Sequence, residues 1–284
     1  MSVAFPLPCG GRFTVACAAV GSSAVQPPQH VLAAFGAKDG VPEPVGTGPV
    51  WRAGDTAFRP ATNPAQASWV AQTLGELEVT DLRVGRPLRS SDGRYVVGGW
   101  VAFKFVEGRH EPRYDDMVAA SLRLHQATAD LDRPRFLGNG ADVFTIADRV
   151  AWDAEEAPMD PKLGGRLFDV FSGSCRPVHQ PLQVVHGDLF GNMLFDGDEA
   201  PGITDFTPFF RPAEWAAAVI VVDAIAWGGA DDGLVSRWSH LSEWPQMVLR
   251  ALLFRLAVHA MHPHSNEQSL LGLEHAANRI SALV

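Results

Sequence analysis

The feature that most constrains the fold of this chain is a polar loop between two short apolar runs, in the segment 184–195. Short apolar runs next to turn residues predict strands, and the loop between them carries His186, Asp188 and Asn192. A third short strand is expected just before Asp205. We therefore expect oxygen-bearing side chains to converge at the ends of neighbouring strands.

These residue types favour one kind of chemistry. Mg²⁺ prefers oxygen ligands and is commonly held by one or two carboxylates together with substrate phosphates. A further carboxylate can accept a hydroxyl proton. Taken singly, a loop aspartate is more often a turn or capping residue. For His186 the sequence favours a structural role, in which its side chain supports the loop through hydrogen bonds.

The motif His186-Gly187-Asp188-Leu189, followed by Asn192 and Asp205-Phe206, resembles the catalytic and metal-binding loops of the aminoglycoside and choline phosphotransferases. The resemblance implies that Asp188 is the catalytic base and that Asn192 and Asp205 hold Mg²⁺ against the phosphates of ATP. Asn192 follows Asp188 by four residues, where the family usually has five. Gly191 is expected to compensate through an unusual backbone angle, which glycine adopts at little steric cost.

The resemblance also implies an α+β, protein-kinase-like fold with a small antiparallel β lobe and a larger, mainly helical lobe. We expect a loosely ordered extension over residues 1–29, a nucleotide-covering lobe over 30–108 and a catalytic lobe over 109–284. A length of 284 residues with 46% hydrophobic residues is sufficient for two such lobes.

In the small lobe, a short helix is expected first, and three strands follow at 44–45, 50–52 and 56–59. Gly46 and Gly48 lie where the family has a loop that covers the phosphates, although a plain hairpin turn explains a Gly-x-Gly equally well. Arg59 ends the third strand, where the family usually presents a lysine to ATP. Its guanidinium can bind phosphate oxygens, and a solvated surface arginine is the alternative.

Residues 63–77 carry the signals of an amphipathic helix. Asn63 is suited to cap it, Pro64 suits the first helical position and Gln66 completes a capping-box pattern. The family's helix offers a glutamate to the phosphate-binding lysine, but here the nearest, Glu76, lies at the helix end. This departure favours an alternative function, a catalytically degenerate nucleotide-binding or scaffold protein.

Two longer strands, over 82–89 and 95–106, are expected to pair across an Asp92-Gly93 turn. The large lobe is expected to contain helices at 114–129, 165–171, 213–227, 243–261 and 267–283. Asp223 lies within the most apolar of these helices. Because burying a carboxylate without hydrogen-bond donors is costly, we expect Asp223 to support the catalytic loop through backbone N–H groups or His186.

Charge and cysteine content limit the partners. The 23 basic and 32 acidic residues give a net charge of −9, which argues against a nucleic-acid or anionic-membrane surface. The three cysteines are odd in number and show no metal-ligand spacing, which predicts free thiols in a reducing compartment. No apolar run approaches the roughly 20 residues of a membrane span. The sequence therefore predicts a cytoplasmic protein without a nucleic-acid, membrane or evident protein partner.

The predicted function is an ATP- and Mg²⁺-dependent phosphotransferase that transfers the γ-phosphate to a hydroxyl group of a small molecule. The sequence does not identify this acceptor. An acidic pocket for an amine-bearing acceptor would use Asp148, Asp153, Glu155 or Glu156. The same residues equally predict a solvated acidic loop.

Overall fold

The computed structural model describes residues 25–46 and 48–283. Its contacts divide the chain into two compact units. Unit 1 is the chain up to Glu111 together with Gly191–Phe206, and unit 2 is Pro112–Phe190 together with the chain from Thr207 onward. The sequence predicts a single lobe boundary at residue 108, whereas the segment 191–206 belongs with unit 1 because its strands pair there. Most of the predicted extension, residues 1–24, lies outside the described residues.

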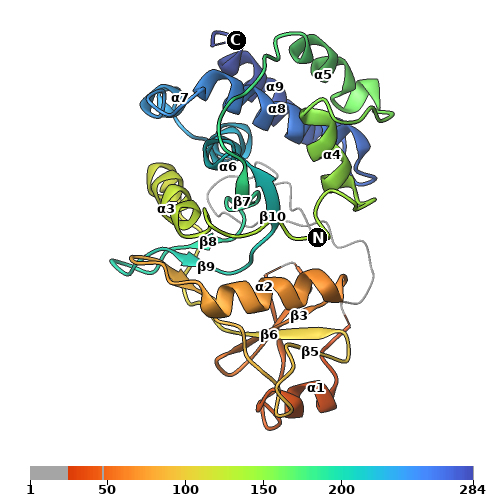
Figure 1. Cartoon of the computed structure of the whole chain (residues 1–284), viewed down its shortest axis with the longest axis vertical. Helices are drawn as coiled ribbons and strands as arrows, with labels where there is room; N and C mark the ends of the chain where they lie inside the picture. The colour runs from red at the N-terminus through yellow and green to blue at the C-terminus, as the bar shows by residue number, and fades with distance from the viewer. Residues whose placement is uncertain (1–24, 47, 284) are drawn as a thin grey trace. The chain divides into compact units, whose positions relative to one another are not determined.

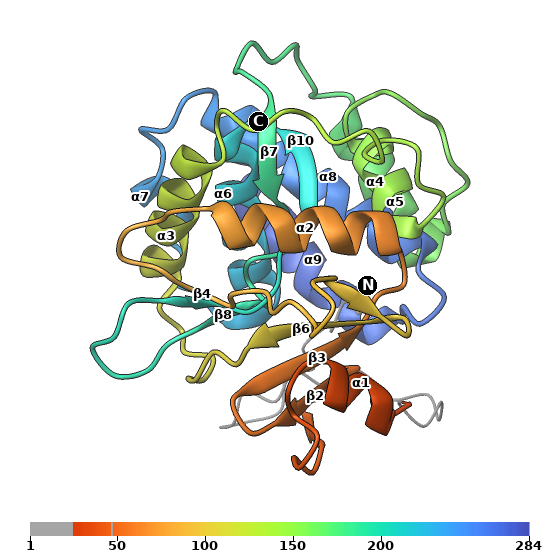
Figure 2. The same ribbon diagram turned by 60° about the horizontal axis from the view of Figure 1, so that its bottom comes forward.

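Unit 1 contains a five-stranded antiparallel sheet with the order β1-β2-β3-β6-β5. Its strands are β1 (Glu43–Val45), β2 (Val50–Ala53), β3 (Thr56–Pro60), β5 (Val96–Val97) and β6 (Trp100–Lys104). Helix α1 (Gln29–Ala34) packs its apolar residues with Phe58 and Ala102 on one face of this sheet. Figures 1 and 2 show α2 (Pro64–Glu76) on the opposite face.

The start of α2 agrees with the sequence prediction. The side chain of Asn63 accepts a hydrogen bond from the backbone N–H of Gln66 at 3.2 Å, and Pro64 is the first helical residue. The apolar face is also the predicted one, since Val70, Thr73 and Leu74 are buried. No glutamate occurs within α2 before its last residue.

The predicted hairpin over 82–106 is partly wrong. The strand expected over 82–89 is reduced to β4 (Arg83–Val84) and an isolated antiparallel bridge between Pro87 and Phe103 of β6. The second strand breaks into β5 and β6 at Gly98-Gly99. Both glycines have positive φ, of 56° and 78°, the requirement of a tight two-residue hairpin turn. The Asp92-Gly93 signal marks only a local turn, in which the N–H of Gly93 donates to the carbonyl of Ser90.

A second small sheet completes unit 1. Strand β9 (Gly202–Ile203) lies between β4, which it pairs in parallel, and β8 (Met193–Leu194), which it pairs in antiparallel orientation. The segment just before Asp205 therefore belongs to unit 1, because it forms β9 of this sheet.

Unit 2 is built around two helices that lack a polar face. In α6 (Ala213–Asp223) every residue from Trp215 onward is buried, and in α8 (Trp244–Met261) every residue from Met247 to Ala260 is buried. Such helices are surrounded on all sides. Around them lie α3 (Tyr114–Ala127), α4 (Val143–Ala151), α5 (Gly165–Ser172), the π-helical segment Ala224–Gly228 and α9 (Glu267–Ile280).

Unit 2 also holds elements that the sequence did not predict. Strand β10 (Pro208–Arg211) pairs with β7 (Gln183–His186), and the 3-10 turn Pro161–Leu163 and α7 (Leu234–Arg237) complete the unit. The aromatic run after Asp205 forms β10 because β7 offers it an antiparallel partner. No helix in the described parts of the chain is both long and apolar enough to span a membrane.

Candidate active site

Two buried histidines hold the loop that follows β7. The ring Nδ1 of His186 accepts a hydrogen bond from the backbone N–H of Asp188 at 3.1 Å, and the backbone N–H of His186 donates to Nε2 of His125 at 2.9 Å. Burial, reinforced by the neighbouring His186, lowers the pKa of His125 to about 3. His125 is therefore neutral, and its Nδ1–H points to Ser121 Oγ, 3.3 Å away.

The glycine of the loop is required by packing. A Cβ atom at Gly187 would lie 2.4 Å from Cδ2 of Phe209, a residue of β10, which is far inside van der Waals contact. The backbone N–H of Gly187 donates to the carbonyl of Thr207 at 3.0 Å. The loop and β10 thus fit together only because residue 187 lacks a side chain.

Asp188 belongs to a buried network in unit 2. Its Oδ1 accepts a hydrogen bond from Nη2 of Arg255 at 3.0 Å, and Nε of Arg255 donates to Oδ1 of Asp223 at 2.7 Å. Nη2 of Arg255 also binds Oδ2 of Asp223. The side chains of Arg255 and Asp223 are each 2% exposed and that of Asp188 is 23% exposed.

The partner of Asp223 differs from the expected ones. The sequence predicts backbone N–H groups or His186, whereas the structure shows a bidentate pair with Arg255. Burial raises the pKa of Asp223 to about 6 against the opposing charge of Arg255. Burial also acts to lower the pKa of Arg255, but the charges of Asp223 and Asp188 outweigh it and raise this pKa, so that the arginine stays charged.

Arg255 is a partner of Asp188 that the sequence did not indicate. A signal was available, because α6 and α8 are both apolar and each carries isolated charged residues, Asp223 in one and Arg255 in the other. Buried charges are normally paired, so two apolar helices with opposite charges predict a contact. Only the tertiary packing shows which residues meet.

In unit 1, Asn192 and Asp205 lie at the same end of the β8–β9 hairpin. Met193 pairs with Ile203, and just beyond this pair the N–H of Thr204 donates to the carbonyl of Asn192 at 3.0 Å. Asp205 is the next residue after Thr204. The proposed compensation by Gly191 is wrong, because Gly191 is not among the glycines with positive φ in the described chain.

Arg59 is paired with Asp205. The Nη1 atom of Arg59, on β3, contacts Oδ1 of Asp205, and the guanidinium lies over the ring of Phe103, 4.5 Å from its centroid. The Arg59 side chain is only 15% exposed. It is therefore a bound cation beside a carboxylate, and the alternative of a solvated surface arginine is wrong.

Gly46 and Gly48 lie in the connection between β1 and β2. Gly46 has a φ of 62°, and a Cβ atom at either glycine would meet no atom within 4 Å. The connection therefore has open space beside it, which suits both a hairpin turn and a loop over phosphates.

The donor set in unit 1 fits Mg²⁺. Asp205 and Asn192 supply one carboxylate and one amide oxygen, and Mg²⁺ typically takes few protein ligands because water and phosphate oxygens fill its remaining positions. No group of three or more His, Cys, Asp or Glu side chains that could bind a metal occurs among the described residues.

The acidic residues considered for an amine-bearing acceptor are largely engaged within unit 2. Asp148 forms a bidentate pair with Arg211 at 2.7 and 2.8 Å, Asp153 binds Arg250, and Glu155 binds Arg149. Burial raises the pKa of Asp148 against the charge of Arg211. An acidic pocket built from these carboxylates is not supported, because three of the four are neutralised by arginines.

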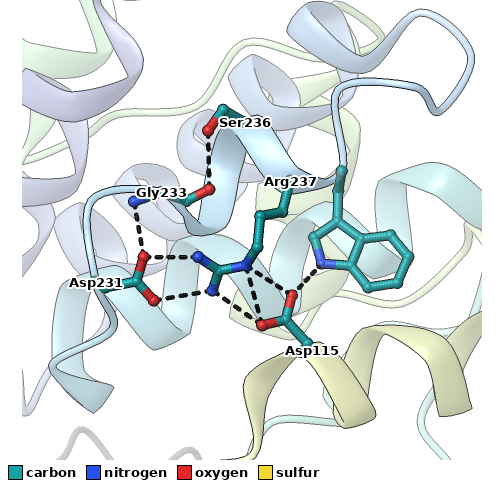
Figure 3. Close-up of polar contacts among 6 residues, drawn as sticks. Asp115, Asp231, Gly233, Ser236 and Arg237 are labelled. Atoms are coloured by element: carbon teal, nitrogen blue, oxygen red, sulfur yellow. Dashed lines mark hydrogen bonds and ion pairs between the residues drawn. The ribbon is translucent and has the colours of Figure 1, made fainter.

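A second arginine also binds two aspartates, but at the surface. Figure 3 shows Arg237 between Asp115 and Asp231. The indole N–H of Trp238 also donates to Oδ1 of Asp115 at 2.8 Å. The side chains of Arg237, Asp115 and Asp231 are 41, 49 and 63% exposed. This cluster links α3 to α7 and has the same composition as the buried network, without its burial.

The fold belongs to a known class. The chain is similar to the crystal structure of a choline/ethanolamine kinase family protein from Mesorhizobium loti, with a TM-score of 0.52 and 17% identity over 90% of this chain and 92% of that one. A weaker likeness, with a TM-score of 0.48 and 8% identity over 82% of this chain and 89% of that one, is found to choline kinase LicA from Streptococcus pneumoniae. The predicted α+β, protein-kinase-like fold is confirmed.

The family follows from the sequence. Residues 51–209, more than half of the 284-residue chain, match the model of the phosphotransferase enzyme family. The chain belongs to this family, which confirms the aminoglycoside/choline phosphotransferase-like resemblance. No curated protein sequence matches it significantly.

Proposed function

We propose that this protein is an ATP- and Mg²⁺-dependent phosphotransferase that transfers the γ-phosphate of ATP to a hydroxyl group of a small molecule. Membership of the phosphotransferase family supports the reaction class. The observation that carries the proposal is the hairpin geometry of unit 1, where Asn192 and Asp205 lie at one end of β8–β9 and a cation, Arg59, binds Asp205.

Each residue has a proposed role. Asp188 accepts the hydroxyl proton or orients the hydroxyl oxygen, and His186 keeps the backbone N–H of Asp188 fixed through its Nδ1. Asn192 and Asp205 would hold Mg²⁺, which neutralises phosphate charge when bound. Arg59 contributes positive charge toward the phosphates, and Gly46 and Gly48 leave room for them. Positioning and charge neutralisation, rather than covalent chemistry, supply most of the rate in this reaction class.

The proposed partner is a small-molecule acceptor. The net charge of −9 disfavours nucleic acid and anionic membranes as partners. Because ATP is the proposed donor, we also propose a cytoplasmic location.

One observation favours a second candidate, a nucleotide-binding protein without turnover. Arg59 binds Asp205 instead of a carboxylate of α2, so the cation–glutamate pair that the family resemblance implies is replaced. If this replacement prevents catalysis, the protein would bind Mg²⁺–ATP as a scaffold.

Measuring Mg²⁺-dependent ATP binding and turnover separates the two candidates. The wild type, Asp188→Ala and Asp205→Ala would be compared with choline, ethanolamine and an aminoglycoside as acceptors and with water alone. We expect turnover that falls by at least roughly 100-fold in either variant, because each removes a whole catalytic element. Nucleotide binding without any turnover sensitive to Asp188 would support the scaffold instead.

A further inference from the structure

We propose that Arg255 is a positioning residue for the reaction: it orients the carboxylate of Asp188, and Asp223 fixes Arg255 for this task. The inference rests on the proposed function, because it assigns a role toward the proposed catalytic base. It concerns contacts within unit 2 alone.

The geometry of the guanidinium carries the argument. Arg255 uses Nε and Nη2 as a two-pronged fork on Asp223, with Nε at 2.7 Å from Oδ1. A bidentate pair fixes the guanidinium plane, since the five N–H donors of arginine have a rigid arrangement. The remaining N–H of Nη2 then has a fixed direction, and it donates to Oδ1 of Asp188 at 3.0 Å.

The ion pair between Arg255 and Asp223 is more deeply buried than the contact between Arg255 and Asp188. Arg255 and Asp223 are both 2% exposed, so each satisfies the other's charge within the core. The bond to Asp188 is additional to this pairing, and only Asp188 among the three reaches the surface, with 23% exposure. Asp223 on α6 and Arg255 on α8 therefore hold the carboxylate of Asp188 in a fixed position.

A second consequence is that Asp223 and Asp188 share the positive charge of Arg255. One guanidinium bound to two carboxylates leaves the network with a formal charge of −1. With Asp223 present, Asp188 is held in place while the arginine's charge is already compensated.

The decisive variant removes both core charges together. Arg255→Met combined with Asp223→Leu replaces the buried pair with apolar side chains of similar size, an exchange that proteins often tolerate. We expect a melting temperature close to that of the wild type, an unchanged KM for Mg²⁺–ATP, and a kcat for ATP turnover lowered by about 10- to 100-fold, the usual effect of a misplaced catalytic group. A kcat within about twofold of the wild type would overturn the inference, since a purely structural pair is replaceable.

Arg255→Lys gives an independent measurement if the double variant does not fold. Lysine keeps the buried positive charge but is a compact point donor without the fork. We expect a folded protein whose kcat falls while the KM for Mg²⁺–ATP stays constant. Wild-type kcat in this variant would also overturn the inference. Arg237→Met is the matched control, because Arg237 binds two aspartates at the surface and should leave kcat unchanged.

Failure of this inference is distinguishable from failure of the proposed function. If Asp188→Asn abolishes turnover but the Arg255 variants do not lower kcat, only the positioning role is overturned. If the wild type itself shows no turnover with the acceptor panel or with water, both proposals are overturned.

Discussion

The guanidinium of Arg59 on β3 is ion-paired with the carboxylate of Asp205, two residues after β9. This pair joins the five-stranded sheet to the β8–β9 hairpin within unit 1. It brings Arg59, which the sequence resemblance implies in place of the family's usual lysine, into contact with a carboxylate proposed to hold Mg²⁺. Nucleotide phosphates bound at Arg59 would therefore share its guanidinium with Asp205.

We predict that Arg59→Gln raises the KM for Mg²⁺–ATP about tenfold, the effect of losing roughly 1.4 kcal/mol from a charge-assisted hydrogen bond. Steady-state kinetics at fixed Mg²⁺ would measure it. Arg94→Gln is the control, because Arg94 is 64% exposed and pairs only locally with Asp92. An unchanged KM in Arg59→Gln would exclude the phosphate role.

The two glycines of the catalytic loop should respond differently to alanine. Gly187→Ala forces a methyl group into the ring of Phe209, and overpacking of this kind typically costs about 1–3 kcal/mol of unfolding free energy. Gly191→Ala meets no atom within 4 Å and should change the unfolding free energy by less than about 0.5 kcal/mol. Urea denaturation of both variants measures the difference. Adding Phe209→Leu should partly restore the stability of Gly187→Ala, and equal losses in the two glycine variants would contradict the packing argument.

His125 should make a contribution to the stability of unit 2 that is lost below neutral pH. Folding lowers the pKa of His125 to about 3, so between that pH and its ordinary value of 6.5 the unfolded chain binds a proton that the folded chain does not. The contribution of His125 is therefore fully present above pH 6.5 and is lost as the pH decreases, by about 2 kcal/mol at pH 5. Asp223 acts in the opposite direction, because burial raises its pKa to about 6 and the folded chain binds a proton there as the pH falls.

Denaturation of the wild type and His125→Gln at several pH values tests this assignment. The glutamine variant should lack the part of the pH dependence that His125 contributes, because its amide does not titrate. His275→Gln changes an exposed histidine of α9 and should retain the wild-type profile. A His125→Gln profile parallel to that of the wild type would assign the pH dependence to other groups.

The buried arginine network should be sensitive to the loss of one partner. Arg255→Met leaves Asp223 buried without its cation, which we expect to cost about 3–5 kcal/mol of unfolding free energy. Adding Asp223→Leu should recover most of this loss, and the surface variant Arg237→Met should have little measurable effect because exposed ion pairs contribute weakly. Thermal and urea denaturation of the three variants provide the comparison. A stable Arg255→Met single variant would mean that Asp223 finds another partner.

Local sequence signals predicted many elements correctly. Asn63 and Pro64 mark the start of α2, and apolar patterning places α3, α8 and α9 within a few residues of their ends. These features depend on contacts between residues close in the chain. The motif around Asp188 also predicted the family, since residue types and order are enough to match it.

Elements whose formation depends on a distant partner were missed or misplaced. Strand β10 forms because β7 is beside it. Residues 82–89 form only β4, which pairs with β9, and an isolated antiparallel bridge from Pro87 to Phe103. The Asp92-Gly93 signal is as strong locally as Gly98-Gly99, but only the second pair of residues lies between two strands that meet. A turn signal predicts a turn, and pairing decides whether it joins two strands.

The sequence by itself determined the family, the α+β, protein-kinase-like fold and the candidate residues, because these depend on residue type and spacing. Tertiary structure alone decided the partners: Arg255 for Asp223 and Asp188, His125 for His186, and Asp205 for Arg59. The physical reason is that a buried or half-buried charge needs an opposite charge or a hydrogen-bond partner. Several residues of the right type exist along the chain, and only packing brings one of them within reach.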